Sequence, residues 1–211
     1  MKHLIIIGAR GYAREVYCLA TKTKEYSNGE YDIKGFLDDK KDALEDVAGT
    51  YPPILSTVED YKIQPDDIFI CALGDSNYRK KYSDIILNKG GEFITLINPS
   101  AEINPTTTIG KGCIVNANTM ICSNVKIGDF VTIQSCDVIG HDVTIGNYVS
   151  IESFVFLGGY ASVGNYSTMH TRSTIIPHKS VGENVKVGVG SVVMRKFKDN
   201  MTVFGYPAKQ I

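Results

Sequence analysis

An aliphatic residue returns at every sixth position over nearly half of the chain. The series is Ile97, Ile103, Ile109, Val115, Ile121, Ile127, Ile133, Ile139, Ile145, Ile151, Leu157, Val163, Met169, Ile175, Val181, Val187 and Val193. An α-helix returns its apolar face about every 3.6 residues and a coiled coil about every 3.5, so neither explains a strict period of six. Such a period, with small residues often four places later, is typical of a parallel β-solenoid whose coils stack on one another.

The second position of each repeat indicates how many repeats make one coil. If three do, residues eighteen apart stack at about 4.8 Å. The second positions then sort into an all-glycine column (Gly110, Gly128, Gly146, Gly164, Gly182), a mixed column (Asn104, Cys122, Gly140, Gly158, Ile176) and a polar column (Asn98, Asn116, Gln134, Glu152, His170). This segregation predicts three non-equivalent faces. The polar column is either a hydrogen-bond ladder between subunits or the wall of a cleft.

The first part of the chain has a different pattern, in which short apolar runs alternate with helical segments. It predicts strands at 4–7, 33–37, 68–73 and 93–96, and helices from the turn at residue 11 to about 24, near 58–61 and at 77–89. Alternating strands and helices with glycine at strand ends predict a small doubly wound α/β sheet, about half of a dinucleotide-binding fold. We therefore expect an α/β domain over 1–96, a solenoid over 97–194 and a basic tail over 195–211.

Composition narrows the class of protein. The net charge of −1 offers no basic field for nucleic acid or an anionic membrane. Five cysteines without a C-x-x-C pair argue against a zinc knuckle or a disulfide framework and fit a reducing cytosol. The apolar run Leu4–Ile7 is too short for a signal peptide or a membrane span. We expect a cytoplasmic protein without membrane insertion.

A glycine turn and an acidic pair stand at the ends of the first two predicted strands. The turn from Gly8 to Gly11 opens a helix, and such a turn can hold a diphosphate against free backbone N–H groups. Its G-x-x-G-x-A spacing does not meet the dinucleotide fingerprint, so a plain tight turn is the alternative. Asp38 and Asp39 stand where related sheets place a carboxylate against a ribose or base, the alternative being a solvated strand end.

These segments, followed by the hexapeptides, resemble a known family. They are Gly8-Ala9-Arg10-Gly11, Phe36-Leu37-Asp38-Asp39 and Ala72-Leu73-Gly74-Asp75-Ser76-Asn77-Tyr78-Arg79, with repeats such as Ile145-Gly146-Asn147-Tyr148-Val149-Ser150. The chain is similar over its whole length to the hexapeptide-repeat acyltransferases, and within them to bacterial nucleotide-amino-sugar N-acetyltransferases and sialic acid O-acetyltransferases. The resemblance implies a left-handed parallel β-helix, a homotrimer and acetyl-CoA bound between neighbouring helices.

The resemblance also assigns binding residues. It implies that the N-terminal domain holds the nucleotide of a sugar nucleotide, not NAD. Tyr12 stands where the family often has a histidine. Substrate contacts are assigned to Gly8, Arg10, Gly11, Asp38, Asp39, Gly74, Asn77, Gln134 and Glu152, and acetyl-CoA contacts to Gly159, His170, Gly188 and Lys209.

His141 is the residue of the repeats with the most evident chemistry. It is third in its hexapeptide and therefore at an outward corner, with Gly159 one coil above it and Ser123 one coil below. A glycine over the imidazole leaves space for a ligand and exposes a backbone N–H, whereas a surface turn histidine is the alternative. The resemblance implies a catalytic His141 and an oxyanion donor at Gly159. The group that orients the ring stays open between the adjacent Asp142 and the polar column residues Gln134 and Glu152.

Other chemistries fit the sequence less well. His141 and His178 share a face but stand two coils, about 10 Å, apart, whereas zinc ligands must converge. We therefore expect no metal. Cys136 has no evident neighbouring base, which disfavours an acyl-carrying nucleophile. The basic residues from Arg195 to Lys198, with Lys209, either meet CoA phosphates or are merely solvated, and the tail from Gly205 to Lys209 resembles the closing motif of CoA-dependent members.

These observations predict an acetyl-CoA-dependent N-acetyltransferase acting on a UDP- or dTDP-linked 4-amino-4,6-dideoxy sugar for bacterial surface glycan synthesis. The alternatives are an O-acetyltransferase for sialic acid or a sugar hydroxyl, and a non-catalytic nucleotide-sugar-binding trimer. The pairing of His141 with Gly159 disfavours the scaffold, which needs neither. Nothing in the sequence separates an amine from a hydroxyl acceptor, and fold analogy cannot do so.

Overall fold

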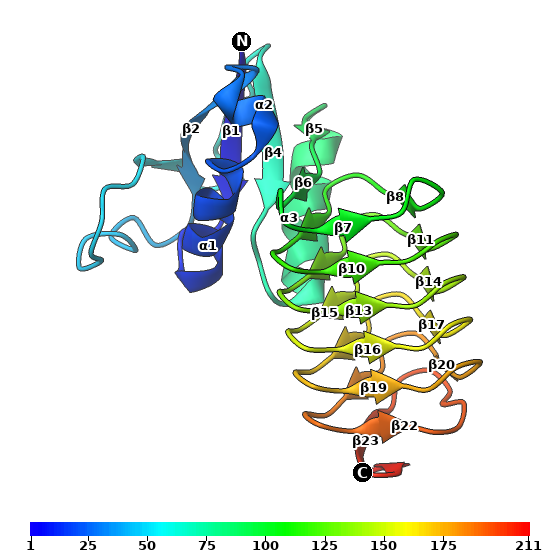
Figure 1. The fold of residues 1–211 in the computed structure, drawn as a ribbon. Helices are drawn as coiled ribbons and strands as arrows, with labels where there is room; N and C mark the ends of the chain where they lie inside the picture. The colour runs from blue at the N-terminus through cyan, green and yellow to red at the C-terminus, as the bar shows by residue number, and fades with distance from the viewer. The chain divides into compact units, whose positions relative to one another are not determined.

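The computed structural model describes residues 1–211, which form two compact units, Met1–Pro99 and Ser100–Ile211. The first is an α/β unit and the second is a solenoid of short parallel strands (Figure 1). The fold class predicted from the sequence, an α/β domain followed by a parallel β-solenoid, is confirmed.

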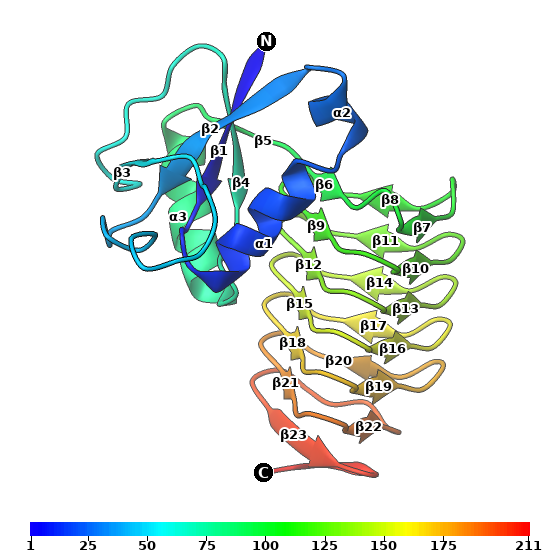
Figure 2. The ribbon, with the colours of Figure 1, turned by 60° about the vertical axis from the view of Figure 1, so that its left-hand side comes forward.

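The α/β unit contains a five-stranded parallel sheet in the order β3-β2-β1-β4-β5. Its strands are β1 (Lys2–Ile7), β2 (Tyr31–Leu37), β3 (Ile54–Ser56), β4 (Asp67–Cys71) and β5 (Glu92–Phe93). Helices α1 (Gly11–Ala20) and α3 (Ser76–Asn88) lie on opposite faces of the sheet (Figure 2). The chain leaves β1 towards one edge and β4 towards the other. The carboxyl ends of these two strands are therefore a topological switch point, where sheets of this kind bind ligands.

Some predicted elements of this unit are wrong in detail. The first helix ends at Ala20 rather than near Lys24, and Thr23 caps a separate short helix, α2 (Lys24–Ser27). The predicted helix near 58–61 is only a turn, in which Tyr61 N–H donates to the Thr57 carbonyl. The predicted strand at 93–96 is divided between β5 and β6 (Leu96–Ile97), and β3 was not predicted.

The solenoid has three strand-bearing faces. Face one contains β7 (Glu102–Ile103), β10 (Met120–Ile121), β13 (Val138–Ile139), β16 (Phe156–Leu157), β19 (Thr174–Ile175) and β22 (Val192–Val193). Face two contains β8 (Thr108–Ile109), β11 (Lys126–Ile127), β14 (Thr144–Ile145), β17 (Ser162–Val163) and β20 (Ser180–Val181). Face three contains β9 (Ile114–Val115), β12 (Thr132–Ile133), β15 (Ser150–Ile151), β18 (Thr168–Met169), β21 (Lys186–Val187), β23 (Thr202–Gly205) and β24 (Ala208–Gln210).

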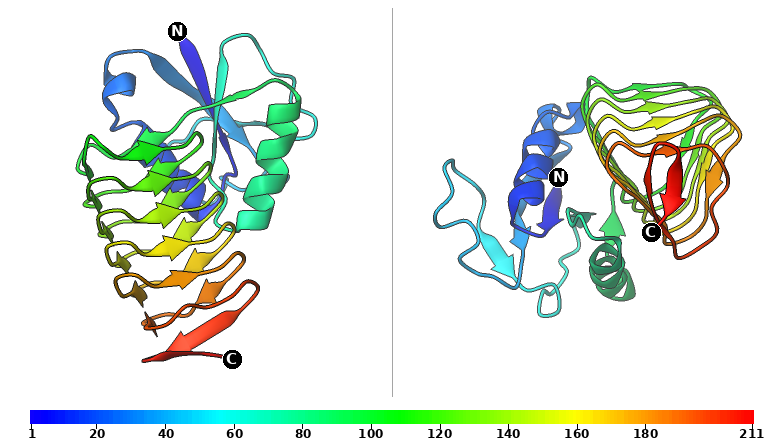
Figure 3. Two further views of the ribbon diagram at one scale, coloured as in Figure 1. Left: turned by 90° about the vertical axis from the view of Figure 1, so that its right-hand side faces the viewer. Right: turned by 90° about the horizontal axis from the view of Figure 1, so that it is seen from below.

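The strands pair in the predicted register of eighteen residues. Met120 pairs with Val138, and Val138 pairs with Phe156, so three hexapeptides make one coil. Seen along the axis, the coils superpose as a three-sided prism (Figure 3). Each residue thus has a neighbour one coil above and another one coil below, which is why a column of the sequence becomes a column in space.

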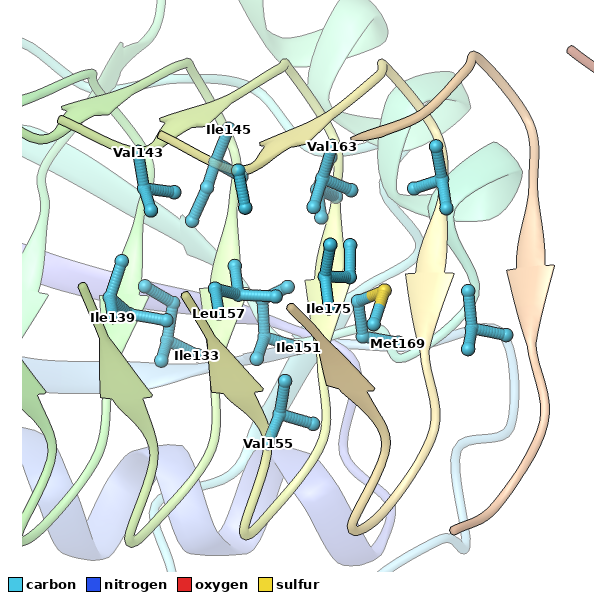
Figure 4. Packing of buried hydrophobic residues seen from close by; sticks show 14 of the residues in the cluster. Ile133, Ile139, Val143, Ile145, Ile151, Val155, Leu157, Val163, Met169 and Ile175 are labelled. Atoms are coloured by element: carbon cyan, nitrogen blue, oxygen red, sulfur yellow. The ribbon is translucent and has the colours of Figure 1, made fainter. Parts of the chain in front are cut away.

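The aliphatic residues at the first position of each repeat form the solenoid interior (Figure 4). Those from Ile121 to Val193 are all buried, as are most of the small residues at the fifth positions. Each fully buried aliphatic side chain stabilises the fold by about 1.5–3 kcal/mol. Because the core is continuous from coil to coil, it fixes the positions of the outward-facing corners.

The three corners of each coil share one backbone feature. From Asn118 to Asn184, the fourth residue of every hexapeptide has a φ between +53° and +66°. Apart from glycine, which is achiral, residues other than Asn and Asp seldom adopt this left-handed conformation. In this solenoid the left-handed conformation recurs at phenylalanine, tyrosine, arginine and histidine. Because every coil has it at the same position, corner side chains of successive coils lie over one another.

The C-terminal segment is more ordered than the predicted tail. β23 adds to face three beside β21, and β24 returns antiparallel to it. This hairpin covers the last coil. None of the helices combines the length and apolar composition needed to cross a bilayer.

Candidate active site

His141 lies at the corner between faces one and two, two residues after the end of β13. Its Nδ1 is 2.8 Å from Asp142 Oδ2, and more than half of its side chain is exposed. Asp142 has a φ of +58°, and this turn brings a carboxylate next in sequence onto the imidazole. Of the three candidate orienting groups, Asp142 is the one that the structure places against His141.

The Asp142 carboxylate is held in its ionised form by several neighbours. The bond to His141 is the largest cause that lowers its pKa below the usual range, and Asn124 and Tyr160 lower it further. Asn124 Nδ2 lies 3.4 Å from Asp142 Oδ1, one coil below. A neutral imidazole beside such a carboxylate carries its proton on Nδ1, which leaves the Nε2 lone pair available as a base.

Gly159 lies one coil above the imidazole. A Cβ built on Gly159 would stand 2.6 Å from His141 Nε2 and 2.8 Å from Cε1, so any side chain there would displace the ring. The Gly159 N–H makes no hydrogen bond within the chain, while its carbonyl accepts from His178 N–H. The structure therefore places a basic nitrogen and an uncommitted backbone donor together at an exposed corner.

The polar column forms a ladder at a different corner, between faces three and one. Asn116 Nδ2 donates to Gln134 Oε1 at 3.2 Å, and His170 Nδ1 lies 2.9 Å from Glu152 Oε1. The other carboxylate oxygen of Glu152 accepts from Thr171. This ladder follows the strands of face three, whereas His141 follows a strand of face one. Gln134 and Glu152 therefore do not contact His141 of the same chain.

The residues assigned to acetyl-CoA occupy separate places along the solenoid. Gly159 is at His141, and His170 is paired with Glu152. Gly188 lies under the ring of Phe204, which a Cβ at position 188 would meet. Lys209, in β24, borders a cleft of about 660 Å³ together with Arg195.

A cleft of about 530 Å³ opens in the α/β unit at the switch point between β1 and β4. Gly8, Arg10, Asp38, Asp39 and Gly74 all line it. Gly11 and Asn77, in the first turns of α1 and α3, do not line it, although their neighbours Tyr12 and Tyr78 do.

The two aspartates of this cleft have different roles in the structure. Asp38 Oδ2 accepts from Ala9 N–H at 2.8 Å, and its Oδ1 accepts from Lys40 N–H at 2.9 Å. Both oxygens of Asp38 are thus engaged with backbone, and this carboxylate ties the glycine turn to the end of β2. Asp39 is exposed and accepts from the Tyr82 hydroxyl at 2.9 Å.

Three tyrosines and one arginine of this site were not among the predicted substrate contacts. Tyr12, Tyr78 and Tyr82 line the cleft, and the spacing of Tyr78 and Tyr82 on α3 puts both on one helix face. Arg79 is fully buried beneath the cleft, and its Nη1 donates to the carbonyls of Leu73 and Gly74. Helical spacing could have revealed the tyrosines, whereas nothing in the sequence distinguished a buried arginine from a solvated one.

No group of three or more His, Cys, Asp or Glu side chains is placed to hold a metal ion. The most perturbed carboxyl group, that of Asp137, is inside the solenoid wall. Burial raises its pKa to about 8, and only its Oδ1 has a partner, Val155 N–H at 2.7 Å.

Comparisons with known proteins agree with this architecture. Residues 3–86 match the family described as the PglD N-terminal domain, and residues 94–189 match the GMPPB C-terminal domain. The UDP-N-acetylbacillosamine N-acetyltransferase of Bacillus subtilis is 30% identical over 120 residues, which are 56% of this chain and 52% of that protein. An uncharacterised mimivirus protein is 29% identical over 128 residues, 61% of this chain and 24% of its own length. The chain thus spans about half or less of the curated relatives it matches.

Solved structures are similar over the whole chain. The acetyltransferase domain of PglB from Neisseria gonorrhoeae, also solved with acetyl coenzyme A, has a TM-score of 0.88 at 27% identity, covering 100% of this chain and 99–100% of its own. The perosamine N-acetyltransferase from Caulobacter crescentus, solved with CoA and GDP-perosamine, has a TM-score of 0.89 at 25% identity, covering 100% and 97%. The predicted resemblance to nucleotide-amino-sugar N-acetyltransferases is confirmed.

Proposed function

We propose that this chain is an acetyl-CoA-dependent N-acetyltransferase that acetylates the amino group of a nucleotide-linked amino sugar. The observation that carries the proposal is the joint placement of His141 Nε2 beneath Gly159 and of Asp142 on His141 Nδ1. A base, its orienting carboxylate and a free N–H donor are the parts that acyl transfer from a thioester needs.

The proposed reaction assigns one step to each of these groups. The amine nitrogen attacks the thioester carbonyl carbon, and a C–N bond forms while His141 Nε2 accepts the amine proton. Negative charge develops on the carbonyl oxygen, and the Gly159 N–H stabilises it. The C–S bond then breaks, and the CoA thiolate takes the proton back from the imidazolium. Because a thiolate is a good leaving group, no covalent enzyme intermediate is required.

We assign the nucleotide of the acceptor to the cleft of the α/β unit. The glycine turn and the α1 N-terminus offer backbone N–H groups to a diphosphate. The Arg10 side chain adds a positive charge. Tyr78 and Tyr82 supply aromatic surface, and Asp39 supplies an acceptor for ribose or base donors. The Caulobacter relative solved with GDP-perosamine supports a nucleotide sugar as acceptor. We propose UDP- or dTDP-linked 4-amino-4,6-dideoxy sugars as the acceptors of this chain.

We further propose a homotrimer in which face one is an interface. Met120, Val138 and Phe156 stand in one outward row on this face, each more than a third exposed, whereas the matching row of face two carries Lys126, Thr144 and Ser162. Closed cyclic symmetry would bring a neighbouring chain to each His141 corner. In that arrangement Gln134 and Glu152 of the polar ladder meet the acceptor sugar of an adjacent subunit, and His170 and Lys209 meet its acetyl-CoA.

Light scattering tests the assembly. A trimer is expected for the unchanged chain and a monomer for Phe156→Glu, with Thr144→Glu on face two as the matched control. A monomeric unchanged chain at micromolar concentration would contradict the trimer.

The experiment for the activity is thiol release from acetyl-CoA against a panel of UDP-, dTDP- and GDP-linked amino sugars, with free sialic acid alongside. Turnover with an amino-sugar nucleotide and mass spectrometry of an N-acetyl product are expected. Turnover with sialic acid alone would point to the O-acetyltransferase alternative. No thiol release with any acceptor, while nucleotide sugars still bind, would favour a binding protein.

A further inference from the structure

One coil above Asp142, the fourth position of the repeat is occupied by Tyr160. Its N–H donates to the His141 carbonyl at 3.0 Å, so the two turns are joined by backbone. The Tyr160 ring stands perpendicular to the imidazole, with 5.2 Å between the ring centroids. About half of the tyrosine, 54%, is exposed to solvent.

Tyr160 contacts both members of the His141–Asp142 pair. The ring contacts the imidazole, and the Tyr160 hydroxyl is one of the groups that lower the pKa of Asp142 and so favour its ionised form. On its other side, Tyr160 stacks on His178 with 4.9 Å between centroids and 7° between planes. The tyrosine is therefore fixed from above and faces the proposed base from the side.

A purely structural explanation exists, because corner residues stack elsewhere in the solenoid. At the corner between faces two and three, Tyr148 stacks on Phe130 at 5.0 Å and on Tyr166 at 5.5 Å. Those rings are nearly parallel throughout. Tyr160 and His178 follow the same pattern, with 7° between their planes. The perpendicular contact between Tyr160 and His141 is additional to it, because it joins the column to the third residue of the coil below.

We propose that Tyr160 is a positioning residue for acetyl transfer, which holds the Asp142–His141 pair so that His141 Nε2 stays under Gly159. This inference rests on the proposed function. The hydroxyl withdraws negative charge from Asp142 and so moderates how strongly that carboxylate stabilises the imidazolium. The ring blocks the imidazole from rotating towards the next coil.

The experiment compares Tyr160→Phe and Tyr160→Leu with Tyr166→Phe and Tyr166→Leu, which alter a stacked tyrosine away from His141. The titratable groups around the imidazole are Asp142, Tyr160 and His178. The series is therefore repeated with His178→Gln, so that His141 is the only imidazole in contact with Tyr160. Two readouts are used: the pH profile of kcat, and NMR titration of the His141 ring without substrate.

Tyr160→Phe removes only the hydroxyl. It is expected to move the acidic limb of the kcat profile and the His141 titration midpoint upward together, by about half a pH unit, because Asp142 then stabilises the imidazolium more strongly. KM for both substrates should stay within about twofold. Tyr160→Leu should lower kcat about tenfold, since the ring no longer fixes the imidazole.

The inference is overturned if both Tyr160 variants leave the His141 titration unchanged, or if the Tyr166 variants move it as far. Absence of acetyl transfer by the unchanged chain, with a His141 titration that still responds to Tyr160→Phe, would overturn the proposed function but not the coupling. The NMR readout therefore separates the two failures.

Discussion

The corner at His141 and the corner at Tyr148 have the same backbone and opposite character. In both, the fourth residue of each hexapeptide adopts a positive φ and lies over its counterpart one coil away. At the second corner the column contains Phe130, 1% exposed, and Tyr148, 8% exposed, stacked face to face. At the first corner the column contains Asp142 and Tyr160, which are partly exposed to solvent and contact His141.

The solenoid therefore supplies the geometry of both corners, and their side chains supply the chemistry. A column of aromatic rings at a corner buries apolar surface and stabilises the packing of successive coils. An acid, a histidine and a glycine in the same geometry can instead move a proton. Regular coils also hold these groups rigidly, because each corner is fixed by buried aliphatic residues on either side.

The largest effect should come from closing the space above the imidazole. Gly159→Ala puts a Cβ within 2.6 Å of His141 Nε2, so the ring must shift. A displacement of about 1 Å in a catalytic group costs about a hundredfold in rate, and we expect that loss in kcat with little change in acetyl-CoA affinity. Steady-state kinetics measure it, with Ser123→Ala, one coil below His141, as the control. An unchanged kcat in Gly159→Ala would show that the space above His141 has no role in catalysis and that the His141 corner is as structural as the Tyr148 corner.

A second effect concerns Asp137, a titratable group in a structural position. With its pKa raised to about 8, the folded chain keeps a proton that the unfolded chain releases near pH 4. The free energy of unfolding therefore falls as the pH rises through this window and levels off above about pH 8. Ser167 accepts Val185 N–H as Asp137 accepts Val155 N–H, so Asp137→Ser is the matched replacement.

Between pH 6 and 8, the unchanged chain should lose about 2 kcal/mol relative to Asp137→Ser. Denaturant unfolding at fixed protein concentration measures this difference. Parallel curves for the two proteins would mean that Asp137 is ionised inside the fold. Perturbed pKa values are often found at functional sites. Asp137 is buried away from both the His141 corner and the nucleotide cleft, so its raised pKa reflects a cost to stability and not a catalytic role.

The smallest effect should arise in the nucleotide cleft. Asp39→Ala removes an exposed acceptor and should raise KM for the sugar nucleotide about tenfold, at unchanged KM for acetyl-CoA. Asp38→Ala should raise the same KM and also lower stability by about 1–3 kcal/mol, because the buried side of the glycine turn loses its acceptor. A rise in KM for acetyl-CoA in either variant would contradict the assignment of the cleft.

Much of this architecture could be predicted because its signals are periodic. The six-residue repeat of aliphatic positions gave the solenoid, the three columns gave the coil of eighteen residues, and the stacking of Gly159 on His141 followed by counting. Alternating strands and helices gave the doubly wound sheet. Each of these depends on spacing along the chain, which the sequence contains directly.

The missed features depend on local conformation or on burial. Tyr160 was not predicted to face His141, because positive φ at a tyrosine is rare and sequence gives no sign of it. The structural role of Asp38, whose oxygens accept from the backbone of Ala9 and Lys40, was not predicted either, and its contact with the nucleotide stays a prediction. Asp142, and not Glu152, lies against His141 because a left-handed turn folds the carboxylate back onto its neighbour.

The most direct measurement compares His141→Ala with Tyr148→Leu for both kcat and stability. His141→Ala should lower kcat at least about a hundredfold, with binding of acetyl-CoA and sugar nucleotide retained and the unfolding midpoint nearly unchanged. Tyr148→Leu should lower the unfolding midpoint and leave kcat within about twofold, because it removes stacked buried surface and no chemistry. Near-normal kcat in His141→Ala across pH 6–9 would contradict the account and indicate an amine that arrives already deprotonated.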